Sequence, residues 1–168
     1  MRESSQAPLA PWQVTSGEPS PGAVERLLRM LPGWFGIDSA NAEYVEAARY
    51  LPTYLAWPGS QPAARPDRQP AGVLLAARHP CSAEIHLMAV DPAMHRRGAG
   101  RALVTALETD LTAEGVQFLQ VKTLGPARPD AGYDQTRQFY ASIGFQPLEE
   151  IRDLWPGNPC LIMIKALR

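Results

Sequence analysis

Cysteine and long apolar runs are both scarce in this chain of 168 residues. Its two cysteines, Cys81 and Cys160, are too few for the disulfide framework that stabilises small secreted domains. No apolar run approaches the ~20 residues that a membrane-spanning helix needs, and the polar segment 1–6 lacks the apolar core of a signal peptide. The sequence therefore predicts a cytoplasmic protein with reduced thiols and no membrane partner.

An excess of one charge sign is missing as well. The chain has 16 Lys and Arg against 17 Asp and Glu, a formal net charge of −1, whereas proteins that bind nucleic acid present a basic face. The balance therefore argues against nucleic acid as a partner. The three histidines, His79, His86 and His95, show no spacing typical of metal ligands, so we expect no metal site.

The length suits one domain over residues 1–168, and the apolar fraction of 45% is ordinary for a globular protein. We expect a monomer or a homodimer. The 17 prolines cluster near the N-terminus and around residues 58–70. Residues 1–10 are expected to be disordered, and loop 58–70, which carries Arg65 and Arg68, either is disordered or gates a site.

The pattern of apolar residues and chain breakers predicts an α/β domain in which hairpin strands come first and strand–helix–strand units follow. One helix has Leu103, Leu107 and Leu111 at four-residue spacing and Gly115 as its stop. The predicted fold is a mixed central sheet of six to seven strands flanked by four helices. Strands are expected over residues 12–14, 53–57, 72–78, 83–90, 116–123, 145–148 and 160–166, and helices over residues 24–31, 39–50, 98–114 and 134–143.

The segment from Val90 to Arg101 places a glycine-bearing loop between a predicted strand and a predicted helix. The first turn of a helix has four backbone N–H groups without partners in the helix, at the positive end of its dipole. Gly98 and Gly100 would let phosphate groups approach these N–H groups. Positive charge comes from Arg96, Arg97 and Arg101. The segment therefore predicts a pyrophosphate site, and the alternative is a loop with solvated arginines.

Two common pyrophosphate motifs do not fit this segment. The dinucleotide fingerprint needs a third small residue where Leu103 stands, and the P-loop needs a Gly-Lys-Ser/Thr sequence that is absent. Residues 95–100, His-Arg-Arg-Gly-Ala-Gly, instead resemble the coenzyme A loop of the Gcn5-related N-acetyltransferases (GNAT). That loop reads Gln/Arg-x-x-Gly-x-Gly/Ala after a strand ending in Val-x-Pro. His95 departs from it at the first position, a minor change because the loop works mainly through backbone N–H groups.

A second stretch, Phe139–Phe145, is similar to the end of a GNAT helix. It reads Phe-Tyr-Ala-Ser-Ile-Gly-Phe and matches the family pattern Phe-Tyr-x-x-x-Gly-Phe at every fixed position. Tyr133 stands where the family often has Asn. The resemblance covers residues 71–148 and implies that the chain binds acetyl-coenzyme A and transfers its acetyl group.

The resemblance also implies which residues contact coenzyme A. The end of the strand before the loop would bind the pantetheine arm through its backbone, as a sheet edge binds an added strand. Two parallel strands would diverge there, and residues 121–123 of the second strand would line the opposite side of the gap. The expected cofactor-binding residues are Met88, Ala89, Val90, His95, Arg96, Arg97, Gly98, Ala99, Gly100, Arg101, Tyr133 and Tyr140.

Acetyl transfer to an amine requires two proton transfers. The amine must lose a proton before it attacks, and the thiolate leaves better when it is protonated. Tyr140 corresponds to the family's acid, and an ordinary pKa of about 10 keeps a tyrosine protonated. Glu84 takes the place of the base in the histone-acetylating branch, with His86 and ordered water as alternatives. Strict alternation would put Glu84 and His86 on one strand face with Met88 and Val90.

The acceptor is expected to be the primary amine of a small molecule, with a protein lysine or N-terminus as the alternative. Six apolar or aromatic residues in the first third of the chain either line an acceptor pocket or pack helices on the sheet. They are Trp34, Phe35, Ile37, Tyr44, Tyr50 and Tyr54. A non-catalytic module that binds acyl-coenzyme A is the alternative from another functional class.

Overall fold

The computed structural model describes residues 11–59, 63 and 68–168. The predicted disorder of residues 1–10 lies outside the described residues, and so does Arg65 of the Pro-rich loop.

At the described end of the Pro-rich loop, Arg68 donates to the carbonyl of Pro58, and its Cζ lies 6.0 Å from the ring centroid of Trp57. That this loop gates a site stays a prediction. Cys81 is exposed, Cys160 is buried, and both are free thiols. In the part of the chain that the structure describes, no helix has the length and apolar composition needed to span a membrane.

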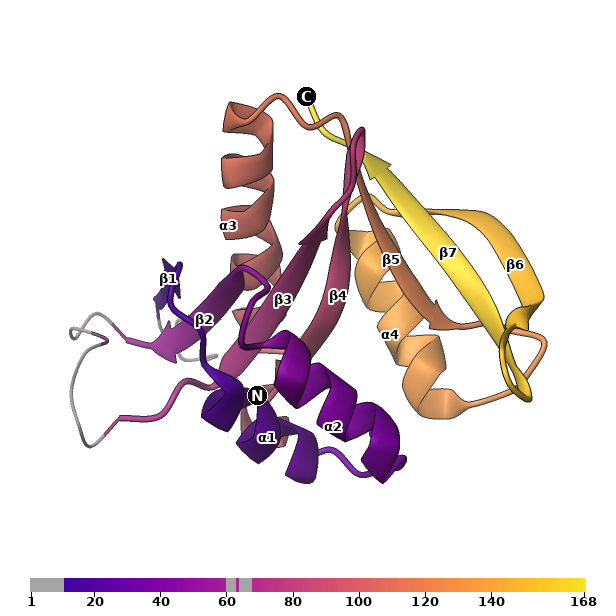
Figure 1. Ribbon diagram of the computed structural model, residues 1–168, viewed down its shortest axis with the longest axis horizontal. Helices are drawn as coiled ribbons and strands as arrows, with labels where there is room; N and C mark the ends of the chain where they lie inside the picture. Colours follow the sequence, from indigo (N-terminus) through magenta and orange to yellow (C-terminus); the bar gives the residue numbers. More distant parts are fainter. Residues whose placement is uncertain (1–10, 60–62, 64–67) are drawn as a thin grey trace, which may run out of the picture.

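The described residues form a seven-stranded mixed sheet and four α-helices (Figure 1), which confirms the fold predicted from the sequence. The strands are β1 (Trp12–Ser16), β2 (Thr53–Pro58), β3 (Gly72–Arg78), β4 (Ser82–Val90), β5 (Phe118–Leu124), β6 (Gln146–Trp155) and β7 (Asn158–Ala166). The helices are α1 (Pro21–Arg29), α2 (Asp38–Ala47), α3 (Ala99–Ala113) and α4 (Ala131–Ser142).

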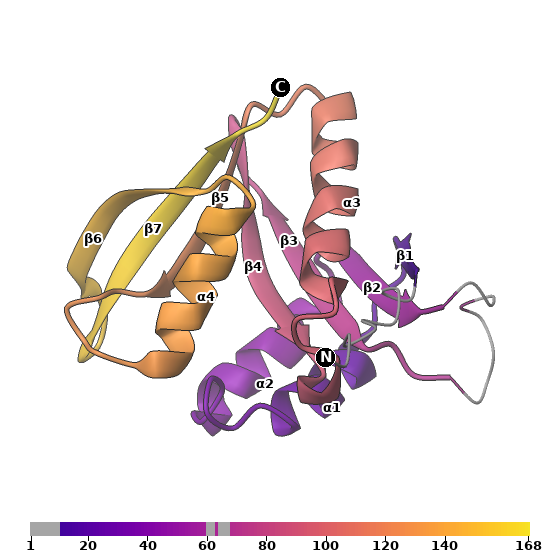
Figure 2. The same ribbon diagram turned by 180° about the vertical axis from the view of Figure 1, so that it is seen from behind.

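The strands follow the order β1-β2-β3-β4-β5-β7-β6. β4 and β5 run parallel, and the other neighbouring pairs in the described chain run antiparallel. Helices α1 and α2 pack on one face of the sheet, and α3 and α4 pack on the other (Figures 1 and 2). The sheet is therefore covered on both sides next to β4.

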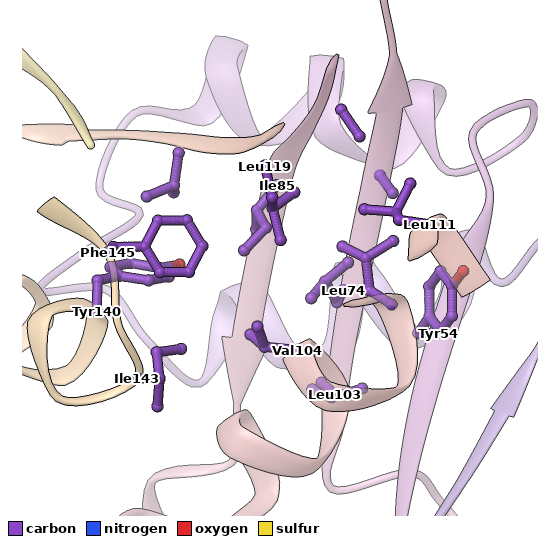
Figure 3. Packing of buried hydrophobic residues seen from close by; sticks show 14 of the residues in the cluster. Tyr54, Leu74, Ile85, Leu103, Val104, Leu111, Leu119, Tyr140, Ile143 and Phe145 are labelled. Atoms are coloured by element: carbon purple, nitrogen blue, oxygen red, sulfur yellow. The ribbon is translucent and has the colours of Figure 1, made fainter. Parts of the chain in front are cut away.

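Two apolar clusters hold the helices on the sheet. Leu103, Leu107 and Leu111 of α3 are fully buried in the larger cluster (Figure 3), and the chain leaves the helix before Gly115, whose φ is +78°. This confirms the helix that the leucine spacing predicts. The smaller cluster packs α1 and α2 on β3 and β4, with Leu27 fully buried. Burial of one such leucine contributes about 1.5–3 kcal/mol.

A β-bulge interrupts the pairing of β3 with β4. Leu75 pairs with Leu87, but its neighbour Ala76 pairs with Ile85. His86 is therefore an extra residue in β4 with no counterpart in β3. Such a bulge bends a strand and shifts the alternation of its side chains by one position.

Beyond the bulge, the side chains of β4 change faces. Met88 and Val90 pack in the cluster under α3 and α4, whereas the ring of His86 contacts Tyr44 of α2 on the opposite face. The prediction that Glu84 and His86 share a face with Met88 and Val90 is therefore wrong, because strict alternation does not survive the extra residue.

β4 and β5 diverge where the acyl-transfer site was expected. Their ladder ends at Ile85 and Val121, whereas β4 continues to Val90 and β5 continues to Leu124. β4 keeps its pairing with β3, and β5 keeps its pairing with β7. Each strand thus has an edge that is open toward the other, and the expected splay beside residues 121–123 is confirmed.

Candidate active site

The loop between β4 and α3 ends in a helix N-terminus without a side-chain cap. A short 3-10 helix, η1 (Pro92–Met94), follows β4 and is capped by the side chain of Asp91. α3 begins at Ala99, and its first backbone bond joins the N–H of Ala102 to the carbonyl of Gly98 at 2.9 Å. The N–H groups of the first three helical residues therefore have no partner in the helix, at the positive end of the helix dipole.

Two residues of this loop adopt the left-handed backbone conformation. The φ of Arg96 is +60°, and that of Gly98 is +91°. A side chain makes this conformation unfavourable by about 1–2 kcal/mol, so the contacts around the loop must hold Arg96 in it. Left-handed residues in a turn direct successive N–H groups toward one point, which creates a concave site for an anion.

The positive charge of the loop has no acidic partner among the residues that the structure describes. Arg96, Arg97 and Arg101 are exposed, and their guanidinium groups form no ion pair with any acidic side chain that the structure describes. Free guanidinium groups beside open N–H groups suit a ligand with several negative charges, such as a pyrophosphate.

Gly100 serves the packing of two helices as well as access to the loop. A Cβ atom at this position would lie 3.2 Å from Cζ of Phe139 in α4 and 3.7 Å from Cε of Met88. Any side chain at this position would therefore be in tight contact with the ring of Phe139. Replacing Gly100 by valine would push the two helices apart, so such a variant would not test phosphate binding alone.

His95 turns back toward β4 instead of extending into solvent. Its Nε2 donates to the carbonyl of Val90 at 2.8 Å, and its ring lies edge-on against Trp34 with centroids 6.0 Å apart. His95 therefore fixes the loop on the end of β4. One backbone group of the expected pantetheine-binding segment, the carbonyl of Val90, already has this intramolecular partner.

Tyr140 of α4 is buried in the cluster under α3 and α4. It is 4% exposed and belongs to the same buried cluster as Ile85 and Val121, the last residues of the ladder. The rings of Phe139 and Phe145 pack edge-on against it at 5.2 and 5.3 Å. In Figure 3 its hydroxyl points from α4 toward the strand that carries Ile85. Burial raises the pKa of Tyr140 above its ordinary value, so the phenol keeps its proton.

Glu84 is buried on the opposite face and is already paired. Its Oε2 lies 2.7 Å from Nζ of Lys122, 3.3 Å from Nε2 of His79 and 3.4 Å from Nε2 of Gln120. Because all three contacts go to one oxygen, only Oε1 is left to accept a proton. Glu84 also precedes Ile85, inside the paired part of the ladder rather than in the opening.

His86 stands at the opening, directly after Ile85, the last residue of β4 that pairs with β5. Its ring lies 5.5 Å from that of Tyr44, which in turn lies 6.0 Å from that of Phe35. Burial is the main cause that lowers the pKa of His86 below its ordinary value; the charge of Glu84 opposes this shift, and that of Lys122 adds to it. The imidazole is therefore neutral at pH 7 and can accept a proton.

Trp34 ties the connection between α1 and α2 to the first turns of α4. Its indole N–H lies 3.3 Å from Oγ1 of Thr136, and its carbonyl accepts from the hydroxyl of Tyr133 at 3.0 Å. The hydroxyl of Tyr133 is thus bound within the protein. A contact between Tyr133 and coenzyme A stays a prediction.

The six residues for which the sequence allows either an acceptor pocket or helix packing do not form one wall. The ring of Tyr44 lies beside that of His86, and the ring of Phe35 lies beside that of Tyr44. Tyr54 instead is buried under α3, where its hydroxyl donates to Asp110 at 2.8 Å, because β2 presents this residue to the opposite face of the sheet. Tyr50 is 71% exposed and projects into solvent. A place for Tyr50 in an acceptor pocket is therefore not supported. For Tyr54 the alternative, the packing of a helix on the sheet, is confirmed.

Residues 63–147, about half of the chain, match the model of the acetyltransferase (GNAT) domain family. The chain belongs to the GNAT family of acetyltransferases. A search of the curated proteins finds no match to this sequence.

Several solved structures share the GNAT fold of this chain. A GNAT-family protein from Desulfovibrio desulfuricans has a TM-score of 0.77 at 17% identity, over 94% of this chain and 100% of its own. The ribosomal-protein-S18-alanine N-acetyltransferase from Escherichia coli has a TM-score of 0.71 at 18% identity, over 94% of each chain. An aminoglycoside 6'-N-acetyltransferase, complexed with coenzyme A, has a TM-score of 0.66 at 16% identity, over 93% of this chain and 97% of its own. At such identities the likeness shows the fold alone.

Two contacts of this GNAT chain were not predicted from its sequence. The indole of Trp12 in β1 donates to the carbonyl of Arg97 in the loop, and that of Trp34 reaches Thr136 in α4. Their partners lie 85 and 102 residues away along the chain. No local pattern signals a contact at that distance, because neither tryptophan belongs to a motif or to a strong apolar period.

Proposed function

We propose that this GNAT chain transfers the acetyl group of acetyl-coenzyme A to the primary amine of a small molecule in the cytoplasm. The observation that carries the proposal is the divergence of β4 and β5 beside a loop with open N–H groups and unpaired arginines. The open edge over residues 86–90 suits the pantetheine arm, as a sheet edge suits an added strand. The loop suits the pyrophosphate. The residues present therefore fit coenzyme A along most of its length.

Acetyl-coenzyme A supplies an acyl group that is already activated as a thioester. The amine is protonated in water at neutral pH and must lose a proton before its nitrogen can attack. His86 takes this proton, because its neutral imidazole stands at the opening on the α2 face. Glu84, which is paired with Lys122, supplies the neighbouring charge that keeps the pKa of His86 from falling further.

Tyr140 protonates the departing sulfur from the other face of the sheet. Its phenol shares a buried cluster with Ile85 and Val121, the residues at which the ladder ends, and burial keeps it protonated. His86 thus accepts the proton of the amine on one face of the sheet, and Tyr140 donates a proton to the sulfur from the other face. A base and an acid separated in this way do not neutralise one another.

The rings of Phe35, Tyr44 and His86 support a small acceptor with a flat or apolar part next to its amine. They contact one another in sequence, at 6.0 and 5.5 Å between centroids, on the α2 side of the opening. Such a group of rings binds an apolar surface, and half-buried rings also keep water away from the amine.

An acceptor panel tests the proposed function. Purified protein is incubated with acetyl-coenzyme A, and thiol release is measured with aromatic amines, aliphatic diamines, aminoglycosides, and peptides that carry a free N-terminus or a lysine. We expect the fastest release with small amines that carry a ring. Release with peptides alone would make the chain a protein acetyltransferase. Binding of acetyl-coenzyme A without release in any class would make it a non-catalytic binding module.

A further inference from the structure

Trp12 lies directly beneath the loop that we assign to the pyrophosphate. It is half-buried in β1, at the edge of the sheet, and packs against the cluster under α3. Its indole Nε1 donates to the carbonyl of Arg97 at 2.6 Å. A Cβ atom on Gly98 would lie 3.6 Å from Nε1 and 3.7 Å from Cδ1 of Trp12. The indole therefore touches the loop on the side that faces β1.

The hydrogen bond of Trp12 fixes the direction of the next N–H group. The peptide between Arg97 and Gly98 is trans, so its carbonyl and its N–H point in opposite directions. Because the carbonyl points at Trp12, the N–H of Gly98 points away from β1. The N–H of Gly98 is therefore turned away from the edge of the sheet that β1 forms.

The loop needs such a tie because its backbone conformation is unfavourable. Arg96 is left-handed without being a glycine, and the preceding residue, His95, is bound to the carbonyl of Val90. Trp12 holds the other end of this short segment at Arg97. The two side chains thus fix both ends of the left-handed turn, and a loop that is fixed before binding loses less conformational entropy when its ligand arrives.

We infer that Trp12 is a positioning residue for coenzyme A, which orients the peptide between Arg97 and Gly98 so that its N–H group meets the pyrophosphate. The inference rests on the proposed function, because it assumes that coenzyme A binds at this loop. Trp12 itself touches no reacting group. Its effect is confined to the affinity for ligands that carry the pyrophosphate.

The test compares Trp12→Phe with the matched variant Trp57→Phe. Trp57 lies in β2, the partner strand of β1, and its indole donates to Oγ1 of Thr15 at 3.0 Å. Each variant therefore loses the indole hydrogen bond of one tryptophan in the β1–β2 pair. Only the bond of Trp12 reaches the loop, so only Trp12→Phe changes the loop. Coenzyme A is titrated into each ¹⁵N-labelled protein, and the backbone amide signals of Gly98 and Ala89 are followed.

We expect Trp12→Phe to weaken coenzyme A binding about three- to tenfold, the range for loss of one neutral hydrogen bond. At saturation, the shift of the Gly98 amide signal should fall to less than half of its wild-type value, while that of Ala89, beside the pantetheine arm, is kept. Trp57→Phe should bind as the wild type does. Should Trp12→Phe fail to fold, β-(3-benzothienyl)alanine at position 12 keeps the bicyclic ring and removes only the N–H.

The inference is overturned if Trp12→Phe, or the isosteric replacement, keeps both the wild-type dissociation constant and the wild-type shift of Gly98. It is also overturned if Trp57→Phe weakens binding to the same extent, since the effect would then come from general loosening of β1 and β2. A wild type in which coenzyme A shifts neither Gly98 nor Ala89 would instead refute the proposed function itself.

Discussion

On the α3 side of β4 the site consists of backbone N–H groups and exposed arginines, whereas on the α2 side it consists of half-buried rings. The first region offers fixed dipoles and unpaired charge, which suit a polyanion of constant shape. The second offers apolar surface and one imidazole whose pKa is lowered by burial. Under the proposed function, main-chain geometry would recognise coenzyme A, and side chains from separate segments would select the acceptor.

Tyr140 lies on the face of the sheet that α3 and α4 cover, and its replacement should give the largest effect. Tyr140→Phe keeps the ring between Phe139 and Phe145 and removes only the proton donor. We expect turnover to fall roughly 10²–10⁴-fold, the usual contribution of a general acid, with the dissociation constant of acetyl-coenzyme A nearly unchanged. Steady-state kinetics and a binding titration measure the two quantities.

Tyr54→Phe is the matched control for this experiment. It removes a second buried phenol, one that is bound to Asp110 under α3 and away from the opening. It should leave turnover within about twofold of the wild type, because the group it removes is not in the site. Equal losses of turnover in the two variants would contradict the assignment of Tyr140 as the acid.

His86→Gln should remove the proposed general base on the α2 side and leave the α3 side unchanged. We expect turnover at pH 7 to fall about 10²-fold, at the lower end for a general base. In the wild type the rate should fall as the pH drops through the pKa of His86, which burial holds below its ordinary value, because the protonated imidazole cannot take a proton. This acidic limb should be missing from the pH profile of His86→Gln.

Glu84→Gln distinguishes the two candidate bases. The charge of Glu84 raises the pKa of His86, so its removal should lower that pKa and move the acidic limb to lower pH. Loss of the limb in Glu84→Gln, with the limb kept in His86→Gln, would make Glu84 the base. A limb kept unchanged in both variants would leave ordered water to take the proton.

Arg97→Ala should affect the α3 side alone and by a smaller amount. Loss of one charge-assisted hydrogen bond should weaken acetyl-coenzyme A binding by about 1.5–3 kcal/mol. The difference from the wild type should shrink in 1 M salt, where charges are screened beyond about 3 Å. Arg152→Ala, which removes an exposed arginine of β6, should bind normally at both salt concentrations. Comparable weakening in both variants would mean that only net charge matters.

The α3 side of β4 could be predicted from the sequence better than the α2 side. The turn before α3, α3 itself and the helix that ends in the Phe139–Phe145 stretch could be predicted because each depends on residues that are close along the chain, such as the leucine spacing of α3. The length of β6 was missed, ten residues instead of four, because most of its residues are exposed and show no apolar alternation.

The α2 side was predicted less well, for a related reason. The bulge at His86 arises from pairing between β3 and β4, and no feature of residues 82–90 alone reveals it. The sequence leaves open whether Tyr54 lines an acceptor pocket or packs a helix, because only strand β2 decides that it faces α3. Contacts that depend on strand pairing leave no periodic pattern of residues in the local sequence.

Calorimetric titration of the purified chain with acetyl-coenzyme A tests the central claim most directly. The account predicts saturable binding at one site, and a rise of about 2.7 kcal/mol in the free energy of unfolding at a hundredfold excess over the dissociation constant. The melting temperature should increase accordingly. An absence of binding heat at millimolar acetyl-coenzyme A, together with an unchanged melting temperature, would contradict it.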